Sequence, residues 1–206
     1  MKSKIIKLLI KKYPKPATKI TKRNPFQTYI KTVLSAQCTD EIVERVSNNL
    51  FKEYKTPQDF VKIKQEKLEQ LIKSTGFYKN KTKNIKKGAK LILKEYNNKI
   101  PYTMSKLLKL PGVARKTANV ILQNSFNKTI GIVVDTHVIR ISQRLGITTS
   151  KNPKKIEEDL MKYFPKDDWK LIPQLFKSLG RDVCKGSKPK CDKCILKEIC
   201  PKIINP

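Results

Sequence analysis

Apolar residues recur along most of this 206-residue chain at steps of three and four. This spacing places them on one face of an α-helix, so we expect a largely helical protein. The clearest stripes are Phe26, Tyr29, Ile30, Val33 and Leu34; Ile42, Val43, Val46 and Leu50; Ala118, Ile121 and Leu122; Val138, Ile141 and Leu145; and Leu171, Leu175 and Leu179. Only the run GIVV at 131–134 resembles a β-strand, and it is too isolated to build a sheet.

Prolines and glycines interrupt these stripes at short intervals. Both residue types end helices or open turns, so the pattern predicts many short helices rather than a few long ones. The interruptions are Thr56-Pro57, Gly76, Pro101, Pro111-Gly112, Asn152-Pro153, Pro165 and Gly180. We therefore expect an all-α fold, without an internal repeat.

The chain carries 46 lysine and arginine residues against 17 acidic ones, for a formal net charge of +29. This excess is larger than solubility requires and predicts a polyanionic partner, with nucleic acid ahead of an anionic membrane. Because the lysines are spread evenly, we expect some of them to be ordinary solvent-exposed residues rather than part of a binding surface. Lys7 interrupts the apolar residues of the opening segment, and no apolar run approaches the roughly 20 residues that span a bilayer. We expect a soluble, intracellular protein that does not enter a membrane.

Four of the five cysteines lie in the last stretch of the chain, at Cys184, Cys191, Cys194 and Cys200. This C-x6-C-x2-C-x5-C spacing suits a disulfide pair, a zinc ion or an iron–sulfur cluster. Disulfides are least favoured, because the flanking lysines favour thiolates. Only Cys191 and Cys194 form the C-x2-C hairpin that zinc sites usually pair, so spacing alone leaves zinc and a cluster open. Cys38 is interpreted as a small buried hydrophobe.

The segment LKLPGVARKTANVIL, residues 108–122, predicts two helices joined by a tight turn at Pro111-Gly112. The second helix is expected to open around Arg115. Successive backbone N–H groups from Gly112 to Ala114 then point outward, where they can bind a phosphate without reading sequence. A plain helix–turn–helix corner is the alternative.

Lys116 is expected in the first turn of this second helix. The positive helix end and Arg115 disfavour an ammonium if the site is partly buried, and a neutral amine is a nucleophile. The alternative is that Lys116, as one lysine among many, is an ordinary solvent-exposed residue without a catalytic role. Downstream, Asp135 precedes a new helical stripe and suits an N-cap, which holds a carboxylate in place. His137, the only histidine, is compatible with a hydrogen-bonded helix residue.

Together these motifs resemble the endonuclease III family of DNA glycosylases and AP lyases. The resemblance runs through LSAQCTD, STGFYKNKTKNI, LPGVARKTANVIL, VVDTHVIR, SLGRDVC and the four-cysteine tail, over nearly the whole chain. It implies a helix–hairpin–helix fold of two helical lobes with DNA in the cleft between them. One lobe would be a six-helix domain at 19–128, with the hairpin at about 103–122. The other would join 1–18 to 129–206 and hold one [4Fe-4S] cluster on the four cysteines.

The resemblance also implies an activity, the removal of oxidised pyrimidines from duplex DNA followed by cleavage 3′ to the abasic site by β-elimination. Lys116 matches the family's nucleophile, which forms a Schiff base, and Asp135 matches its essential carboxylate. Gln37 and His137 match positions that occupy the duplex near the extruded nucleotide. Phe77 falls where the family commonly carries a leucine wedge.

Contacts to DNA phosphates are expected from two segments of the chain. The hairpin would supply Gly112, Val113, Ala114, Arg115 and Thr117. The loop between the first two cysteines of the tail would supply Lys185, Lys188 and Lys190. The shape of this loop would depend on thiolate ligation, so the cluster would hold the lysines against the DNA.

The chain departs from the family pattern at three positions. Phe77 replaces the leucine, and its ring can stack on bases. Ala114 stands where a second hairpin glycine is usual, which requires a backbone conformation that tolerates a Cβ. Leu108 replaces an acidic residue, so any proton relay through that carboxylate is open to question here. None of these departures removes Lys116 or Asp135.

Two alternatives remain at this point. One is a non-catalytic iron–sulfur or zinc DNA-binding protein. The other is an adenine-mismatch glycosylase, which shares the cysteine spacing but lacks a lysine at the nucleophile position, so Lys116 argues against it. We expect a monomer that acts on double-stranded DNA containing damaged pyrimidines or abasic sites, in a prokaryotic cytoplasm and associated with the nucleoid.

Overall fold

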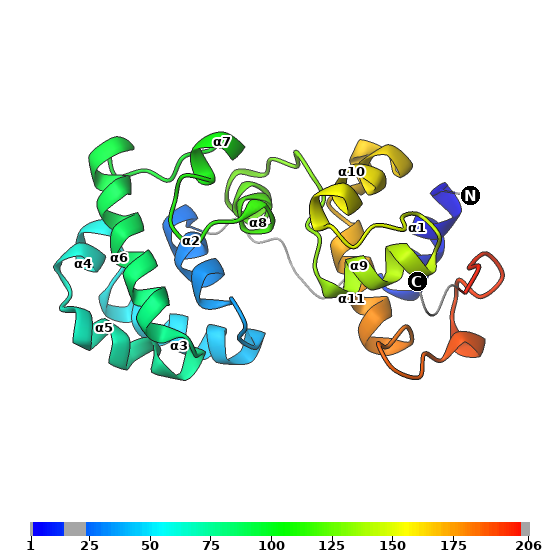
Figure 1. Cartoon of the computed structure of the whole chain (residues 1–206), viewed down its shortest axis with the longest axis horizontal. Helices are drawn as coiled ribbons and strands as arrows, with labels where there is room; N and C mark the ends of the chain where they lie inside the picture. The colour runs from blue at the N-terminus through cyan, green and yellow to red at the C-terminus, as the bar shows by residue number, and fades with distance from the viewer. Residues whose placement is uncertain (1, 15–23, 203–206) are drawn as a thin grey trace. The chain divides into compact units, whose positions relative to one another are not determined.

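The computed structural model describes residues 2–14 and 24–202. Every regular element within those residues is a helix, which confirms the all-α prediction (Figure 1). The chain divides into two compact units, Thr21–Lys128 and a second unit that combines Met1–Ile20 with Thr129–Pro206. The expected boundary between residues 18 and 19 lies outside the described residues.

The unit Thr21–Lys128 is a set of short helices around one apolar core. Its elements are α2 Pro25–Leu34, α3 Asp40–Glu53, α4 Pro57–Lys62, α5 Gln65–Ile72, the 3-10 turn η1 Lys73–Thr75, α6 Tyr78–Glu95, α7 Met104–Leu107 and α8 Arg115–Phe126. Helix α2 packs against α3, α6 and α8. Its residues Tyr29, Ile30 and Leu34 are completely buried. Helix α2 is therefore the central support of the segment that runs from α7 to α8.

The other unit has a separate core built from both ends of the chain. Its elements are α1 Lys2–Lys12, α9 Thr136–Arg144, α10 Pro153–Tyr163, the 3-10 turn η2 Lys166–Asp168, α11 Ile172–Asp182 and the 3-10 turn η3 Cys191–Lys193. Helix α11 packs against α1 and α9. Leu9 and Phe176 are fully buried, and the Tyr13 hydroxyl donates to Asp182 Oδ2 at 2.8 Å. The first described helix thus supports the segment that carries the cysteines.

Side-chain caps begin several of these helices, and two of the caps lie at the predicted interruptions Thr56-Pro57 and Asn152-Pro153. Asn24 Oδ1 accepts a hydrogen bond from the Phe26 N–H at 2.9 Å. Thr56 and Asp59 form a capping box at the start of α4, and Asn152 caps α10 ahead of a proline. Such caps satisfy N–H groups that the first helical turn leaves without acceptors. The prediction of many short helices is confirmed.

The segment 131–134, which resembles a strand in sequence, is a non-helical connection that leads into α9. Ile132 and Val134 are buried in the same core as α9. The described residues include no β-strand. The apolar run therefore reflects burial of a connecting segment rather than sheet formation.

Candidate active site and cysteine cluster

The segment from α7 to α8 forms a helix–hairpin–helix. Gly112 in the turn has a φ of +79°, a conformation that favours glycine because it strains a side chain. The N–H of Val113 donates to the carbonyl of Leu110 at 3.1 Å and closes the turn. The turn therefore lies at the Pro111-Gly112 pair, as the sequence predicts.

Ala114, where the family usually carries glycine, has φ −91° and ψ 172°. This is extended backbone that any residue adopts, so the Cβ of alanine causes no strain there. The expectation that all N–H groups from Gly112 to Ala114 point outward is wrong at Val113. That N–H is used within the turn, and the Val113 side chain is buried. Gly112 and Ala114 are exposed.

The side chain of Tyr29 in α2 connects this helix to the hairpin turn by a hydrogen bond. Its hydroxyl lies 2.9 Å from the carbonyl oxygen of Pro111 and 3.3 Å from that of Asn84. Burial raises the pKa of Tyr29, so the phenol remains a hydrogen-bond donor. A Cβ at Gly88 would overlap the same hydroxyl group. The sequence placed Tyr29 only on an apolar helix face, although a phenol within a buried stripe signals a polar partner.

Lys116 lies in the first turn of α8, immediately after the hairpin. No side chain caps this helix end, and the first turn contains no acidic residue. The first turn therefore offers backbone N–H groups, together with the Lys116 side chain, to an anion. The Lys116 side chain is exposed, so the partial burial that the sequence argument required is not found. Arg115 and Thr117 beside it are half-buried.

Asp135 is the N-cap of α9, as predicted. Its Oδ1 accepts hydrogen bonds from the N–H groups of His137 and Val138, both at 2.9 Å. The described residues provide no hydrogen bond to its Oδ2. Capping therefore fixes the orientation of the carboxylate through Oδ1 and leaves Oδ2 able to interact with another group. Asp135 and Lys116 belong to different units.

His137 is held by a guanidinium group from the next turn of α9. Arg140 Nη2 lies 3.1 Å from His137 Nδ1, and Arg140 Nε donates to the carbonyl of Cys184 at 3.0 Å. A guanidinium only donates hydrogen bonds, so Nδ1 is the acceptor and the imidazole proton is on Nε2. Burial is the main cause of a lowered pKa of His137, with Arg140, Arg181 and Lys177 acting in the same direction. The imidazole is therefore a neutral N–H donor at neutral pH.

Gln37 and Phe77 both lie in loops with left-handed backbone. Gln37 follows α2 with a φ of 51°, and Phe77 precedes α6 with a φ of 48°. Phe77 is 65% exposed, which is unusual for a large aromatic side chain. Cys38, next to Gln37, is partly buried against the core and has the packing role that its apolar surroundings suggest.

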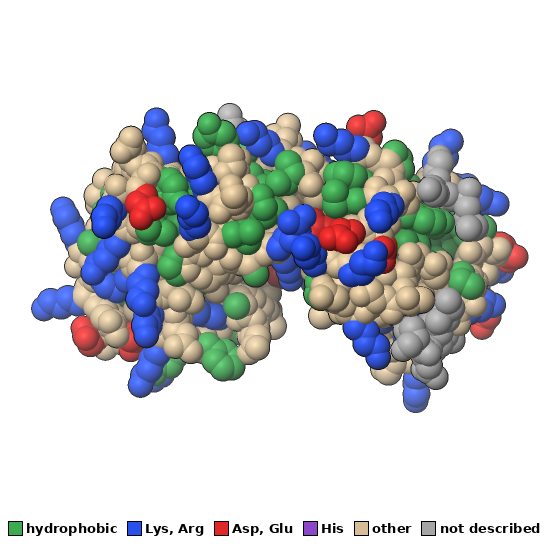
Figure 2. Space-filling model, turned by 45° about the horizontal axis from the view of Figure 1, so that its top comes forward, with side chains coloured by type: hydrophobic (Ala, Val, Ile, Leu, Met, Phe, Trp, Pro, Cys, Tyr) green, Lys and Arg blue, Asp and Glu red, His purple; other side chains and the backbone are tan. Residues whose placement is uncertain are grey.

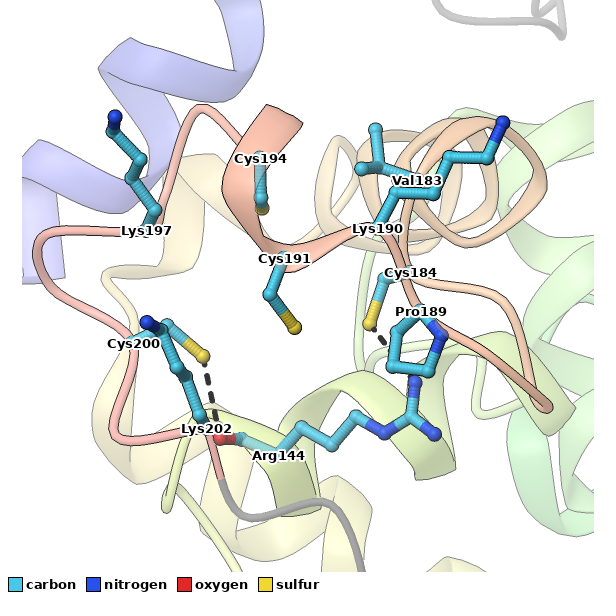
Figure 3. Close-up of a pocket in the computed structure, with 10 residues that line it drawn as sticks. All are labelled: Arg144, Val183, Cys184, Pro189, Lys190, Cys191, Cys194, Lys197, Cys200 and Lys202. Atoms are coloured by element: carbon cyan, nitrogen blue, oxygen red, sulfur yellow. Dashed lines mark hydrogen bonds between the residues drawn. The ribbon is translucent and has the colours of Figure 1, made fainter.

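The four C-terminal cysteines line one cavity (Figure 3). All four are half-buried and none forms a disulfide. In Figure 3 the Sγ atoms of Cys184, Cys191 and Cys200 face the open space between them. Burial, reinforced by the neighbouring cysteines, raises the pKa of the Cys194 and Cys200 thiols. Within the described residues, no three His, Cys, Asp or Glu side chains are grouped as ligands of a metal ion.

Arg144 at the end of α9 organises the rim of this cavity. Its guanidinium donates to Cys184 Sγ at 3.3 Å, to the Lys185 carbonyl at 2.7 Å and to the Gly186 carbonyl at 2.9 Å. Its own carbonyl accepts from Cys200 Sγ at 3.5 Å. The side chain is 6% exposed, so these bonds are shielded from water. Sequence reasoning missed Arg144, because charge alone does not distinguish a buried arginine from a surface one.

The loop that follows Cys184 carries the predicted basic residues at its surface. Lys185, Lys188 and Lys190 are all exposed, and Lys188 has a φ of 48°. The Lys185 and Lys190 N–H groups both donate to the Val183 carbonyl at 3.0 Å, which closes the base of the loop. Lysine and arginine side chains are spread over the face drawn in Figure 2, and acidic side chains are less frequent on it. No helix in the described part of the chain has the length and apolarity needed to cross a bilayer.

Comparison with known proteins agrees with the fold and the motifs. The family model described as HhH-GPD superfamily base excision DNA repair protein matches residues 30–166. Endonuclease III of a Synechocystis species is 43% identical over 97% of this chain and 91% of its own length. Endonuclease III of Bacillus subtilis is 42% identical over 91% of this chain and 86% of its own. The structure of a non-covalent endonuclease III–DNA complex superposes with a TM-score of 0.88 at 40% identity, covering 98% of this chain and 96% of that one.

An all-helical fold with this hairpin and a four-cysteine segment defines the class of helix–hairpin–helix DNA repair proteins. The chain belongs to the HhH-GPD superfamily of base excision DNA repair proteins and, within it, to the endonuclease III family. It is a DNA glycosylase with AP lyase activity.

Proposed function

We propose that this chain removes oxidised pyrimidines from double-stranded DNA, with Lys116 as the nucleophile. Lys116 Nζ attacks C1′ of the damaged nucleotide, the C1′–N bond breaks, and the base leaves with the bonding electrons. The C1′–O4′ bond then breaks, a proton of the amine passes to O4′, and the nitrogen and C1′ form an imine. The imine acidifies C2′, which loses a proton to water. A C2′–C3′ double bond forms as the C3′–O bond breaks, and the 3′ phosphate leaves with the bonding electrons. The observation that carries the proposal is the place of Lys116 in the uncapped first turn of α8, directly after the hairpin.

Asp135 is the carboxylate of this reaction. The sugar carbon gains positive character as the base departs, and a fixed negative group stabilises that charge. The two N–H groups of α9 that bind Asp135 Oδ1 hold the carboxylate in one orientation. The other carboxylate oxygen, Oδ2, is assigned to stabilise the positive charge on the sugar carbon.

Borohydride trapping tests this assignment. Borohydride reduces the imine to a stable amine during incubation with duplex that contains an oxidised pyrimidine. We expect a covalent adduct with the wild type and with Lys90→Ala, an exposed lysine of α6, and none with Lys116→Ala. An adduct that persists in Lys116→Ala would assign the nucleophile elsewhere. The absence of any wild-type adduct would exclude the Schiff-base mechanism on this substrate.

The relative solved in complex with DNA supports DNA as the partner. We assign phosphate binding to the exposed hairpin backbone and the first turn of α8, at Gly112, Ala114, Arg115 and Thr117. Val113 contributes by anchoring the turn in the core rather than by donating to DNA. Insertion into the duplex near the extruded nucleotide is assigned to Gln37, Phe77 and His137.

The four-cysteine cavity is proposed to hold one [4Fe-4S] cluster on Cys184, Cys191, Cys194 and Cys200. Half-buried thiols around a shared cavity suit a group larger than one ion, and the Arg144 N–H at Cys184 Sγ suits a thiolate. When bound, the cluster supplies a fixed anchor for the basic loop between the first two ligands. Iron content and visible absorbance of the purified protein test it, since zinc thiolates are colourless.

The basic loop has its own test. Lys188→Glu is expected to weaken duplex binding and leave the visible spectrum unchanged, because Lys188 is exposed and is not a ligand. Lys154→Glu, an exposed residue of α10, makes the same change of charge away from this loop. Equal affinities for the two variants at moderate salt would remove the role of the loop.

We further propose that the protein acts as a monomer in the cytoplasm of a prokaryotic cell, in association with the nucleoid. The bacterial relatives support this setting. Light scattering of the free protein and of its DNA complex tests the monomer.

A further inference from the structure

Lys81 in the first turns of α6 is a buried lysine that the reaction does not use. Its side chain is 4% exposed, although lysines are almost never buried without a partner. Among the described residues it has no carboxylate partner. Burial lowers the pKa of the Lys81 amine. The nearby Cys38 thiol acts on this pKa in the opposite direction, so the charge is offset by this thiol and by the polar groups around it rather than by a carboxylate.

Two carbonyl groups surround the Lys81 amine. Nζ donates to the carbonyl of Leu34 at 2.8 Å and to the carbonyl of Thr75 at 2.8 Å. Leu34 is the last residue of α2, where carbonyls lack helical N–H partners, and Thr75 is the last residue of η1. A single ammonium therefore joins the ends of two separate elements.

The loops that carry Gln37 and Phe77 begin directly after these two carbonyls. Gln37 lies three positions beyond Leu34, and Phe77 lies two positions beyond Thr75. Both loop residues have left-handed backbone, which strains residues other than glycine. Such conformations persist only where the surrounding structure holds them. The N–H of Lys81 also donates to the Phe77 carbonyl at 3.1 Å, so the same residue contacts this loop twice.

We propose that Lys81 is a positioning residue that fixes the Gln37 loop and the Phe77 loop against each other, so that both side chains enter the DNA duplex together. This inference rests on the insertion roles proposed above for Gln37 and Phe77. Core packing alone does not require a charge here, because a neutral side chain of similar volume fills an interior site without the cost of desolvation. Two backbone acceptors at the start of two loops do require a donor that reaches both.

Lys81→Met tests the proposal, with Lys83→Met as the matched control. Both variants lose one positive charge from α6, but Lys83 is exposed. Rates are measured under single turnover on two substrates. One is a duplex with an oxidised pyrimidine, which requires extrusion, and the other is a single strand with a preformed abasic site, which does not.

We expect Lys81→Met to lower the duplex rate roughly tenfold or more, because small displacements of positioning groups have effects of this size. The single-strand rate should stay within about twofold of the wild type, and Lys83→Met should preserve both rates. A parallel loss on both substrates would overturn the proposal, as would a wild-type duplex rate for Lys81→Met. If Lys81→Met does not fold, Lys81→Gln takes its place. The glutamine amide is one atom shorter than the lysine side chain and does not reach the Leu34 and Thr75 carbonyls together, so the same loss on duplex alone is expected, and a wild-type duplex rate would again overturn the proposal.

Phe77→Ala and the double variant Lys81→Met/Phe77→Ala complete a double-mutant cycle, which measures the coupling between Lys81 and Phe77. If Lys81 acts through Phe77, the double variant should be little slower on duplex than the slower single variant. Full additivity would overturn the coupling. Failure of the proposed insertion role is distinguishable, because Phe77→Ala alone would then have the wild-type duplex rate. Failure of the lysine mechanism would instead appear as an adduct with Lys116→Ala.

Discussion

The hydroxyl group of Tyr29 lies 2.9 Å from the carbonyl oxygen of Pro111, which joins the central helix α2 to the hairpin turn. The Asn84 carbonyl lies 3.3 Å from the same hydroxyl. A phenol has one proton, so it donates to one of the two carbonyls at a time. The Tyr29 hydroxyl is thus a polar contact from the core of α2 to the turn that precedes Lys116.

Tyr29→Phe should therefore weaken both the fold and the hairpin. It removes the donor and leaves a partly buried carbonyl without its partner, which costs about 1–3 kcal/mol of the free energy of unfolding. Urea denaturation measures this loss, and duplex affinity reports on the hairpin. Tyr102→Phe serves as the control, because Tyr102 is 59% exposed and its ring keeps its contact with Lys128. Equal stability of the two variants would contradict the role of the Tyr29 hydroxyl.

Gly88→Ala should be destabilising by about 1–3 kcal/mol, because the new methyl group overlaps the Tyr29 hydroxyl in a packed core. Gly186→Ala is the matched control, since a Cβ there meets no atom within 4 Å. Thermal unfolding compares the two variants. The Gly88→Ala change should cost less in a Tyr29→Phe background, where the overlapping oxygen is absent, and a cost that is the same in both backgrounds would exclude this contact.

With the proposed cluster in the cysteine cavity, Arg144→Met should lower the iron content of the purified protein and speed the loss of iron to a chelator. The substitution keeps the bulk but removes the donors to Cys184 Sγ and to the carbonyls of Lys185 and Gly186. Such supporting contacts typically change metal affinity by about 10- to 100-fold. Lys197→Met is the control, because Lys197 also lines the cavity but is paired with Glu198. Unchanged iron retention in Arg144→Met would refute this expectation.

His137 should titrate below its ordinary pKa of 6.5, mainly because it is partly buried. It is the only histidine in the chain, so one imidazole signal in the NMR spectrum measures it directly. Arg140→Met should raise the pKa by removing a nearby positive charge, and Lys162→Met, an exposed residue of α10, should not. The nitrogen shifts should show the proton on Nε2, and a proton on Nδ1 would contradict the Arg140 contact.

The lowered pKa of His137 also makes the free energy of unfolding depend on pH. The folded state binds the imidazole proton less well than the unfolded state, so the unfolded state gains more protons as pH falls. The contribution of His137 is therefore complete above pH 6.5 and is lost as pH falls toward the folded-state pKa. In Arg140→Met this loss should be smaller, which denaturation at pH 5.5 and 7.5 measures.

The sequence by itself determined the helical stripes, the interruptions between them, the hairpin at Pro111-Gly112 and the family. These are local or periodic properties, and short-range backbone sterics and burial on one helix face decide them. The N-cap role of Asp135 was accessible for the same reason, since capping involves N–H groups only two and three residues away.

Only the tertiary structure decided which polar side chains are buried and what they contact. Tyr29 meets Pro111 across 82 positions, Lys81 meets Leu34 across 47, and Arg144 meets Cys184 across 40. The apolar stripe around Tyr29 marks it as buried but does not identify its partner, and nothing in the sequence near Lys81 or Arg144 distinguishes them from surface lysines and arginines. Their roles depend on carbonyl and sulfur atoms that the fold brings within hydrogen-bond distance, and desolvation makes those partners necessary.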